Sequence, residues 1–140
     1  TQGVSSAASD VYKRQQSDYV SLHLPFNTET KHLINAAAIA RMKQGAFLIN
    51  TARGGLIDEA ALLNALTSGH LGGAGLDVFE NEPNLNDLPV KKLLAHPHVI
   101  ASAHAAGSSE EGLQRTNRIA AQTVIDVLEG RRIDPACLII

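Results

Sequence analysis

Short apolar segments alternate with amphipathic or alanine-rich segments along most of the chain. Four of the apolar segments have the length of buried strands, about four to eight residues, and they end at glycine, proline or polar residues. The predicted strands cover residues 18–24, 46–50, 72–79 and 99–102. The longer segments between and after them carry helical patterns, and the predicted helices cover residues 36–42, 58–68 and 108–130.

Each predicted helix begins at a polar residue that can cap its first turn. Asn35 precedes the first helix, Asp58 precedes the second, and Ser108 or Ser109 precedes the third. Gly130 follows the third helix as a stop signal. The third helix also carries one apolar stripe, made of Leu113, Ala120, Val124, Val127 and Leu128.

The stretch of residues 80–97 is polar and holds three prolines, which predicts a loop with one helical turn near residues 90–94. The order along the chain is therefore strand, helix, strand, helix, strand, loop, strand, helix. Short buried strands that alternate with helices indicate an α/β fold, with a parallel sheet joined by right-handed crossovers. Ligands of such sheets bind beyond the carboxyl ends of the strands, so the chemistry is expected there.

Composition and charge limit the classes of partner expected for this 140-residue chain. Apolar residues make up 44% and charged residues 19%, which is typical of a globular domain. Twelve Lys and Arg against fourteen Asp and Glu leave no basic excess, so no nucleic-acid partner is expected. No apolar run approaches the roughly 18 residues of a membrane helix, so no membrane partner is expected. The single cysteine, Cys137, excludes an internal disulfide and favours the reducing cytoplasm.

An arginine, a glutamate and a histidine each follow a different predicted strand. Arg53 comes after the second strand, Glu82 after the third, and His104 after the fourth. Arginine offers a planar fork for a carboxylate, and histidine exchanges protons near neutral pH. A carboxylate beside the histidine would orient its ring. The three residues together suit a substrate with a carboxylate next to a carbinol that loses a proton.

Each of these residues also has a structural interpretation when it is taken alone. Arg53 could tie neighbouring elements together, Glu82 could be a solvated loop acid, and His104 is one of six histidines. His96 and His98 lie two positions apart, but no third ligand is evident, so no metal site is expected. The Gly-Gly pair after Arg53 is either a simple turn or a backbone nest for an anion.

A long segment of the chain resembles the D-isomer-specific 2-hydroxyacid dehydrogenases, which include the D-3-phosphoglycerate, glyoxylate/hydroxypyruvate and D-lactate dehydrogenases. The resemblance is carried by residues 42–83, MKQGAFLINTARGGLIDEAALLNALTSGHLGGAGLDVFENEP, and it extends over about residues 17–130. It implies an incomplete Rossmann-type parallel sheet with flanking helices, the second half of an NAD(P)-binding domain. Residues 131–140 would begin the return to a substrate domain. Residues 1–16 lack the resemblance, and we interpret them as a separate leader with an artefactual junction as one explanation.

The resemblance also implies roles for individual residues. Arg53 would bind the substrate carboxylate, His104 would be the general acid and base, and Glu82 would be the partner of His104. The residues implied to bind the cofactor are Leu24, Asn50, Thr51, Ala52, Arg53, Asp77, His104, Ala106 and Gly107. The implied reaction is hydride transfer between NAD(P) and the CH–OH group of a D-2-hydroxyacid, with 2-oxoacid reduction in reverse. A homodimer of the intact protein is implied as well.

The sequence departs from the family pattern in three places, and these leave alternatives open. It has no G-x-G-x-x-G loop and no acid about 20 residues beyond one, so NAD and NADP are not distinguished. It has no counterpart of the family's substrate domain, so we expect weak or undetectable cofactor binding by the isolated chain. Ala103 stands where the family has a proline before the histidine.

Other functions are compatible with the same resemblance. One alternative is an interaction module like the C-terminal-binding protein corepressors, in which dinucleotide binding controls protein assembly. Another is a truncated product without function. A formate dehydrogenase is disfavoured, because that group pairs its histidine with glutamine where this chain has Glu82.

Overall fold

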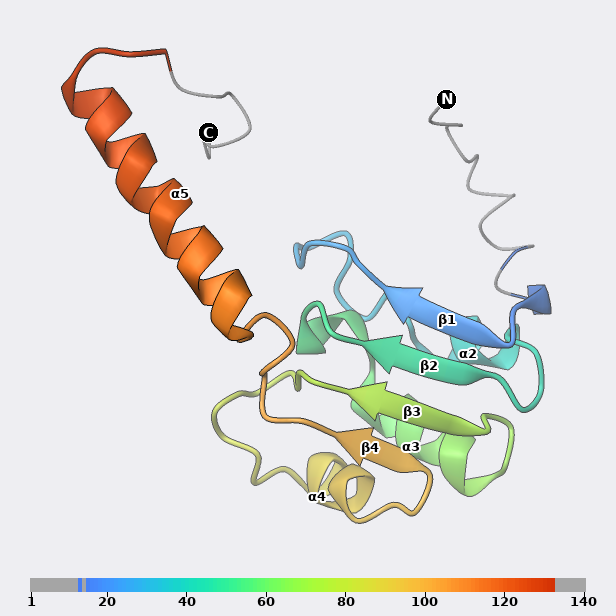
Figure 1. Cartoon of the computed structure of the whole chain (residues 1–140). Helices are drawn as coiled ribbons and strands as arrows, with labels where there is room; N and C mark the ends of the chain where they lie inside the picture. The colour runs from blue at the N-terminus through green and yellow to red at the C-terminus, as the bar shows by residue number, and fades with distance from the viewer. Residues whose placement is uncertain (1–12, 14, 133–140) are drawn as a thin grey trace. The chain divides into compact units, whose positions relative to one another are not determined.

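The structure is a computed structural model that describes residue 13 and residues 15–132. These residues form two compact units, one ending at His104 and one beginning at Ala105 (Figure 1). The first unit contains the strands and all helices but one, and the second contains a single long helix, within the described part of the chain.

The first unit is built on a parallel sheet of four strands in the order β1-β2-β3-β4. The strands are β1 (Tyr19–Leu22), β2 (Phe47–Asn50), β3 (Gly73–Leu76) and β4 (Val99–Ala101). Their last residues stand opposite one another, as Leu22 pairs with Asn50, Asn50 with Leu76, and Leu76 with Ala101. The carboxyl ends therefore meet at one edge, and the predicted parallel α/β sheet is confirmed.

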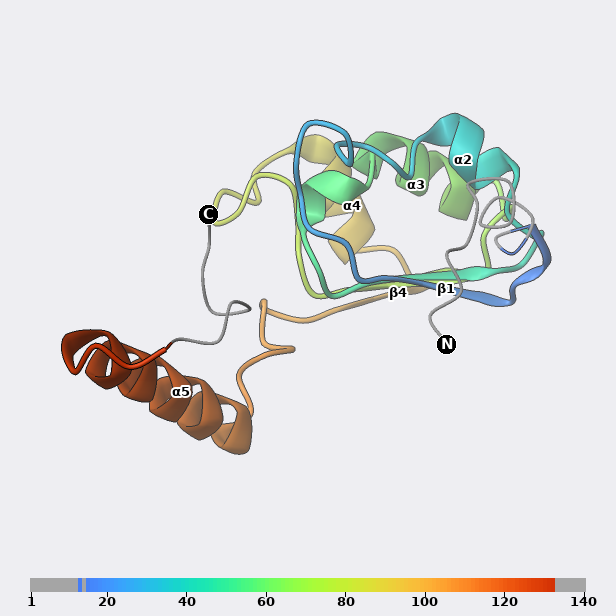
Figure 2. The same ribbon diagram turned by 90° about the horizontal axis from the view of Figure 1, so that it is seen from above.

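Three α-helices lie on one face of this sheet (Figure 2). They are α2 (Ala36–Ala40), α3 (Glu59–Thr67) and α4 (Leu88–Leu94). The predicted caps are confirmed at α2 and α3, because the side chain of Asn35 accepts the Ala38 amide and that of Asp58 accepts the Ala61 amide. A short 3₁₀ helix, η1 (Gly54–Leu56), follows β2.

Helix α4 is longer than the single turn that the sequence indicated. It has seven residues and begins before Pro89, which lies in its first turn. A proline at this position removes an N–H that would have no partner within the helix, so it does not interrupt the helix. The difference matters because Val90 and Leu93 of α4 are fully buried against the rest of the unit.

The core lies between the sheet and these helices. In β1 the burial alternates, with Val20 and Leu22 buried and Tyr19 and Ser21 exposed, as expected for a strand with one covered face. The helices and η1 contribute side chains with no exposed surface, including Leu56 and Leu62. Burying a leucine of this kind stabilises a fold by about 1.5–3 kcal/mol, so the packed core holds the strands and their ends in position.

The second unit contains α5 (Glu110–Leu128), which confirms the predicted third long helix. Its cap is Ser109, whose hydroxyl accepts the Gly112 amide, and Gly130 just after its end has a left-handed φ of 68°. None of the residues in α5 is buried, including those of the predicted apolar stripe. Among the residues that the structure describes, no helix is long and apolar enough to cross a membrane.

Candidate active site

The turn after β2 carries Arg53 and is fixed from the inside by Asn50. The Asn50 side chain is completely buried, its Nδ2 donates to the Arg53 carbonyl at 2.9 Å, and its Oδ1 accepts the Ala52 amide at 3.1 Å. The Arg53 side chain is exposed, and its Nη1 donates to the Ala52 carbonyl at 2.7 Å. The guanidinium is therefore presented at the carboxyl edge of the sheet by a turn that has little freedom.

Gly54 brings this turn into contact with the loop that follows β3. A Cβ at Gly54 would lie 1.9 Å from the Phe79 carbonyl carbon and 2.3 Å from the Glu80 nitrogen, so only glycine fits. Of the two interpretations of the Gly-Gly pair, the turn is the one found, because Gly54 and Gly55 are the buried start of η1. The close approach places Arg53 beside the loop that carries Glu82.

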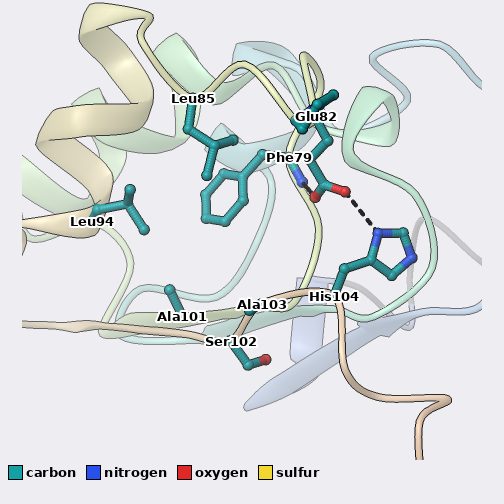
Figure 3. Close-up of a pocket in the computed structure, with 9 residues that line it drawn as sticks. Phe79, Glu82, Leu85, Leu94, Ala101, Ser102, Ala103 and His104 are labelled. Atoms are coloured by element: carbon teal, nitrogen blue, oxygen red, sulfur yellow. Dashed lines mark hydrogen bonds and ion pairs between the residues drawn. The ribbon is translucent and has the colours of Figure 1, made fainter.

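Glu82 and His104 form a hydrogen-bonded pair (Figure 3). His104 Nδ1 lies 2.7 Å from Glu82 Oε2, and Glu82 Oε1 accepts the Phe79 amide at 2.5 Å. Since a carboxylate only accepts, Nδ1 is the donor in this pair, and Nε2 is left as the acceptor of a neutral ring. An unprotonated ring nitrogen held by a carboxylate on the far side is the arrangement that a general base requires.

The backbone at His104 adopts an uncommon conformation. Its φ is 53°, in the left-handed region, where a non-glycine residue costs about 1–3 kcal/mol unless the surroundings hold it. The His104 amide donates to the Asp77 carbonyl at 2.9 Å, and the Asp77 carboxylate accepts the Ser102 hydroxyl at 2.5 Å. Asp77 is 3% exposed while Ser102 is exposed, so this hydrogen bond is partly buried.

The three residues that the sequence placed after three different strands meet at one cavity. Arg53, Glu82 and His104 all line a hollow of about 150 Å³ between the η1 turn and the loop after β3. A larger cavity of about 490 Å³, mostly apolar, borders the same Glu82–His104 pair, with Leu85 and Leu94 in its wall (Figure 3). The lining of the smaller hollow combines Arg53 and His104 with the carboxylates of Glu80 and Glu82, so a carboxylate-binding group and a proton-exchanging group stand together there.

A third hollow lies beyond the ends of β1 and β2. Its volume is about 590 Å³, and Leu24, Phe26, Ala52 and Arg53 are among the residues that line it. Leu24 is 42% exposed, so its side chain is accessible from this hollow. Apolar side chains with one cation at the carboxyl edge of a parallel sheet fit the nicotinamide end of a dinucleotide.

The remaining residues predicted to bind the cofactor occupy different settings. Thr51 is exposed beside the hollow formed by Leu24, while Asn50 uses both ends of its buried amide on the turn. Asp77 lies just past the end of β3. Ala106 and Gly107 belong to the second unit, and their role stays a prediction. Sequence reasoning did not single out Ser102, although a hydroxyl two residues before a candidate base was a usable signal.

A second polar cluster ties the loop before α2 to the loop after β3. His32 Nε2 lies 2.8 Å from Glu80 Oε2, and the Glu80 amide donates to Glu59 Oε1 at 2.9 Å. Burial raises the pKa of Glu59 above its ordinary value, opposed by that amide bond and assisted by the charges of Glu80 and Asp87. This cluster braces the base of the loop from which Glu82 extends.

His70, His96 and His98 make contacts with other parts of the first unit. His96 and His98 pack edge to face with ring centres 5.7 Å apart, and His96 Nδ1 accepts the His98 amide. His70 Nε2 bonds to the Ile39 carbonyl near the end of α2. No group of three or more metal-ligating side chains occurs among the described residues.

The parallel sheet, with its candidate chemistry at the carboxyl ends of the strands, has the architecture typical of dinucleotide-binding domains. Residues 4–106 match the model of the D-isomer specific 2-hydroxyacid dehydrogenase, NAD binding domain. The chain belongs to this family, and the predicted family, fold class and NAD-binding character are confirmed.

Named relatives agree with this assignment. The chain is 47% identical over 115 residues to the D-3-phosphoglycerate dehydrogenase of Bacillus subtilis, a match of 82% of this chain and 21% of that protein. It is 44% identical over 116 residues to a glyoxylate reductase of Thermofilum pendens, which covers 83% of this chain and 33% of that protein. The structure of D-2-hydroxyisocaproate dehydrogenase superposes with a TM-score of 0.82 at 35% identity, over 87% of this chain and 40% of that one. The chain thus spans between about a fifth and two fifths of the length of these proteins.

Proposed function

We propose that this chain carries the catalytic edge of an NAD-dependent dehydrogenase that acts on a small D-2-hydroxyacid and, in reverse, reduces a 2-oxoacid. The observation that supports the proposal is the meeting of Arg53, Glu82 and His104 at one small cavity. An arginine suits the carboxylate of such an acid, and a histidine with a free Nε2 suits the adjacent hydroxyl.

The proton in this reaction would move through His104. Nε2 would take the proton of the C2 hydroxyl while the C2 hydrogen leaves with its electron pair, so that the hydroxyacid becomes a 2-oxoacid. Bound NAD supplies the hydride acceptor. The positive charge that forms on the imidazole would be stabilised by Glu82, 2.7 Å from Nδ1. In reverse, His104 would return the proton to the carbonyl oxygen.

Arg53 would hold and orient the substrate. Its guanidinium can engage both carboxylate oxygens at once, which fixes the direction in which the C2 hydroxyl points. Because Asn50 fixes the Arg53 carbonyl, the side chain starts from a defined point. Lysine at this position would keep the charge but lose the planar fork, so it should not replace arginine fully.

The cofactor would lie along the carboxyl edge, with its nicotinamide end near Leu24, Ala52 and Asp77. Arg53 and His104 would border it, and Thr51 would lie along it. Asn50 would serve it indirectly, through the turn. The choice between NAD and NADP is left open by these residues.

The substrate class, assembly and location follow from the same proposal. The substrates would be small 2-hydroxyacids and 2-oxoacids, the protein would work as a homodimer, and its place would be the cytoplasm, in line with the single cysteine. Light scattering tests the assembly directly, with a mass of twice the monomer as the expected result.

The function can be tested by binding, which does not require complete turnover. Because the isolated chain is expected to bind the cofactor weakly, pyruvate is titrated into it at a large excess of NAD⁺, and the side-chain NMR signals of Arg53 and His104 are followed. Both signals should shift with pyruvate and much less with acetate, which has the carboxylate but no C2 oxygen. R53Q should lose the response to pyruvate while its amide spectrum stays that of the folded chain. Equal responses to pyruvate and acetate, or a response that survives R53Q, would contradict the proposal.

A further inference from the structure

Ser102 and His104 both donate hydrogen bonds to Asp77, the residue just past the end of β3. The Ser102 hydroxyl donates to Asp77 Oδ1 at 2.5 Å, and the His104 amide donates to the Asp77 carbonyl at 2.9 Å. The Ser102 amide also donates to the Leu76 carbonyl, as a continuation of the β3–β4 ladder. We call these contacts of residues 102–104 with Asp77 the Asp77 clamp.

The clamp lies in an exposed stretch of the chain. The His104 side chain is 53% exposed, and its φ of 53° is unfavourable for a residue other than glycine. Ala103 has no side chain that reaches a polar partner, and it too is exposed. Glu82 fixes the imidazole ring at one nitrogen, but a single ring contact does not fix the backbone that carries the ring.

The geometry points to Ser102 as a positioning residue for His104. We propose that its hydroxyl, by holding the Asp77 carboxylate, keeps residues 102–104 against β3, so that Nδ1 meets Glu82 and Nε2 is left for the substrate. Ser102 itself does not act on the reacting atoms, since its hydroxyl points away from the Glu82–His104 pair (Figure 3). This inference rests on the proposed function, in which His104 is the general acid and base.

The test measures the His104 backbone in the chain without substrate or cofactor. Amide hydrogen exchange reports the bond from the His104 amide to Asp77, and the three-bond coupling between the amide and α protons reports φ. In S102A the His104 amide should exchange about five- to tenfold faster, as expected from the loss of one hydrogen bond. The Ala74 amide, bonded to the His98 carbonyl at the other end of the β3–β4 pair, should keep its rate.

Rescue distinguishes positioning from a general loss of stability. S102T keeps a hydroxyl at this position, so its His104 amide should exchange at the rate of the original chain. Adding A103P to S102A should also restore it, because proline fixes the backbone on the N-terminal side of His104. Proline removes no hydrogen bond here, since within the described part of the chain the Ala103 N–H donates to no partner. S21A, which removes another exposed serine hydroxyl at a strand end, should change neither amide.

Each other outcome overturns the inference. If S102A leaves His104 exchange and coupling unchanged, Ser102 has no positioning role. If Ala74 exchange accelerates as much as that of His104, the hydroxyl merely stabilises the strand pair. Should S102A not fold, S102T decides the question, because rapid His104 exchange in that folded variant, which keeps the hydroxyl, would contradict the clamp. None of these readouts depends on substrate binding, so the proposed function can fail separately.

Discussion

The two segments that carry Arg53 and His104 are held in opposite ways. The Arg53 turn is fixed by packing, with Asn50 completely buried and Gly54 pressed against the backbone of Phe79. The His104 segment is exposed and depends on hydrogen bonds to Glu82 and Asp77. One half of the candidate site is therefore fixed by burial. The other half lies at the surface and is held by hydrogen bonds.

This difference separates stability from function. A substitution at a buried position lowers the free energy of unfolding, whatever the role of that residue in binding. A residue held by a few surface hydrogen bonds can be changed with little effect on folding and a large effect on geometry. Substitutions in the two segments should therefore give different patterns when unfolding and ligand response are measured side by side.

The largest effect on stability is expected at Gly54. G54A places a methyl group 1.9 Å from the Phe79 carbonyl carbon, so the η1 turn or the loop after β3 must move. The free energy of unfolding should fall by about 3 kcal/mol or more, at the upper end of overpacking effects. Urea unfolding measures the loss. G75A is the matched control, because its methyl would only touch Ile49 at 3.9 Å, and its stability should change by less than about 0.5 kcal/mol.

The next effect is expected at Asn50. N50A removes both side-chain bonds within the turn and leaves the Arg53 carbonyl and the Ala52 amide without that partner. The expected loss is about 1–3 kcal/mol of unfolding free energy, the usual result of leaving buried polar groups unpaired. T51A, at the exposed neighbouring position, should stay within about 0.5 kcal/mol. A loss in T51A equal to that in N50A would show that the turn is not fixed from inside.

A much smaller stability change is expected at His104. H104G removes the Glu82 contact but also relieves the left-handed backbone, and these opposite effects should keep the unfolding free energy within about 0.5–1 kcal/mol of the original. The same variant should lose the response to pyruvate. A large destabilisation by H104G would mean that this segment belongs to the core as much as the Arg53 turn does.

The smallest effect is a pH dependence at Glu59. Its pKa is raised in the folded chain, so the protonated form favours folding, and this contribution is lost as the pH rises through the folded pKa. E59Q should therefore be slightly more stable than the original chain near neutral pH and no more stable well below pH 4.5. Thermal unfolding at the two pH values measures this, with E29Q as the exposed control. A gain in E59Q that is equal at both pH values would contradict the burial of this carboxylate.

The elements that the sequence predicted best are those with local signals. Asn35, Asp58 and Ser109 begin their helices as expected, because a cap is a contact within three residues along the chain. The extent of α4 was missed because its first turn contains a proline and follows a polar loop, although proline is favoured in a first helical turn.

The candidate site could be predicted as a set of residues but not as a geometry. The order of strands in a parallel sheet brings Arg53, Glu82 and His104 to one edge, which explains why spacing and resemblance sufficed. The Asp77–Ser102 bond joins residues 25 positions apart, and the Gly54 contact joins two loops through backbone atoms. Such contacts depend on the final register and have no signature in the local sequence.

The protonation of the His104 ring tests the central claim most directly. A long-range ¹⁵N–¹H spectrum, recorded where the ring is neutral, identifies which nitrogen carries the hydrogen. The arrangement described here places it on Nδ1, facing Glu82, and leaves Nε2 free, and E82Q should disturb that preference. Hydrogen on Nε2 in the original chain, with no change in E82Q, would show that the pair is not set up as a general base.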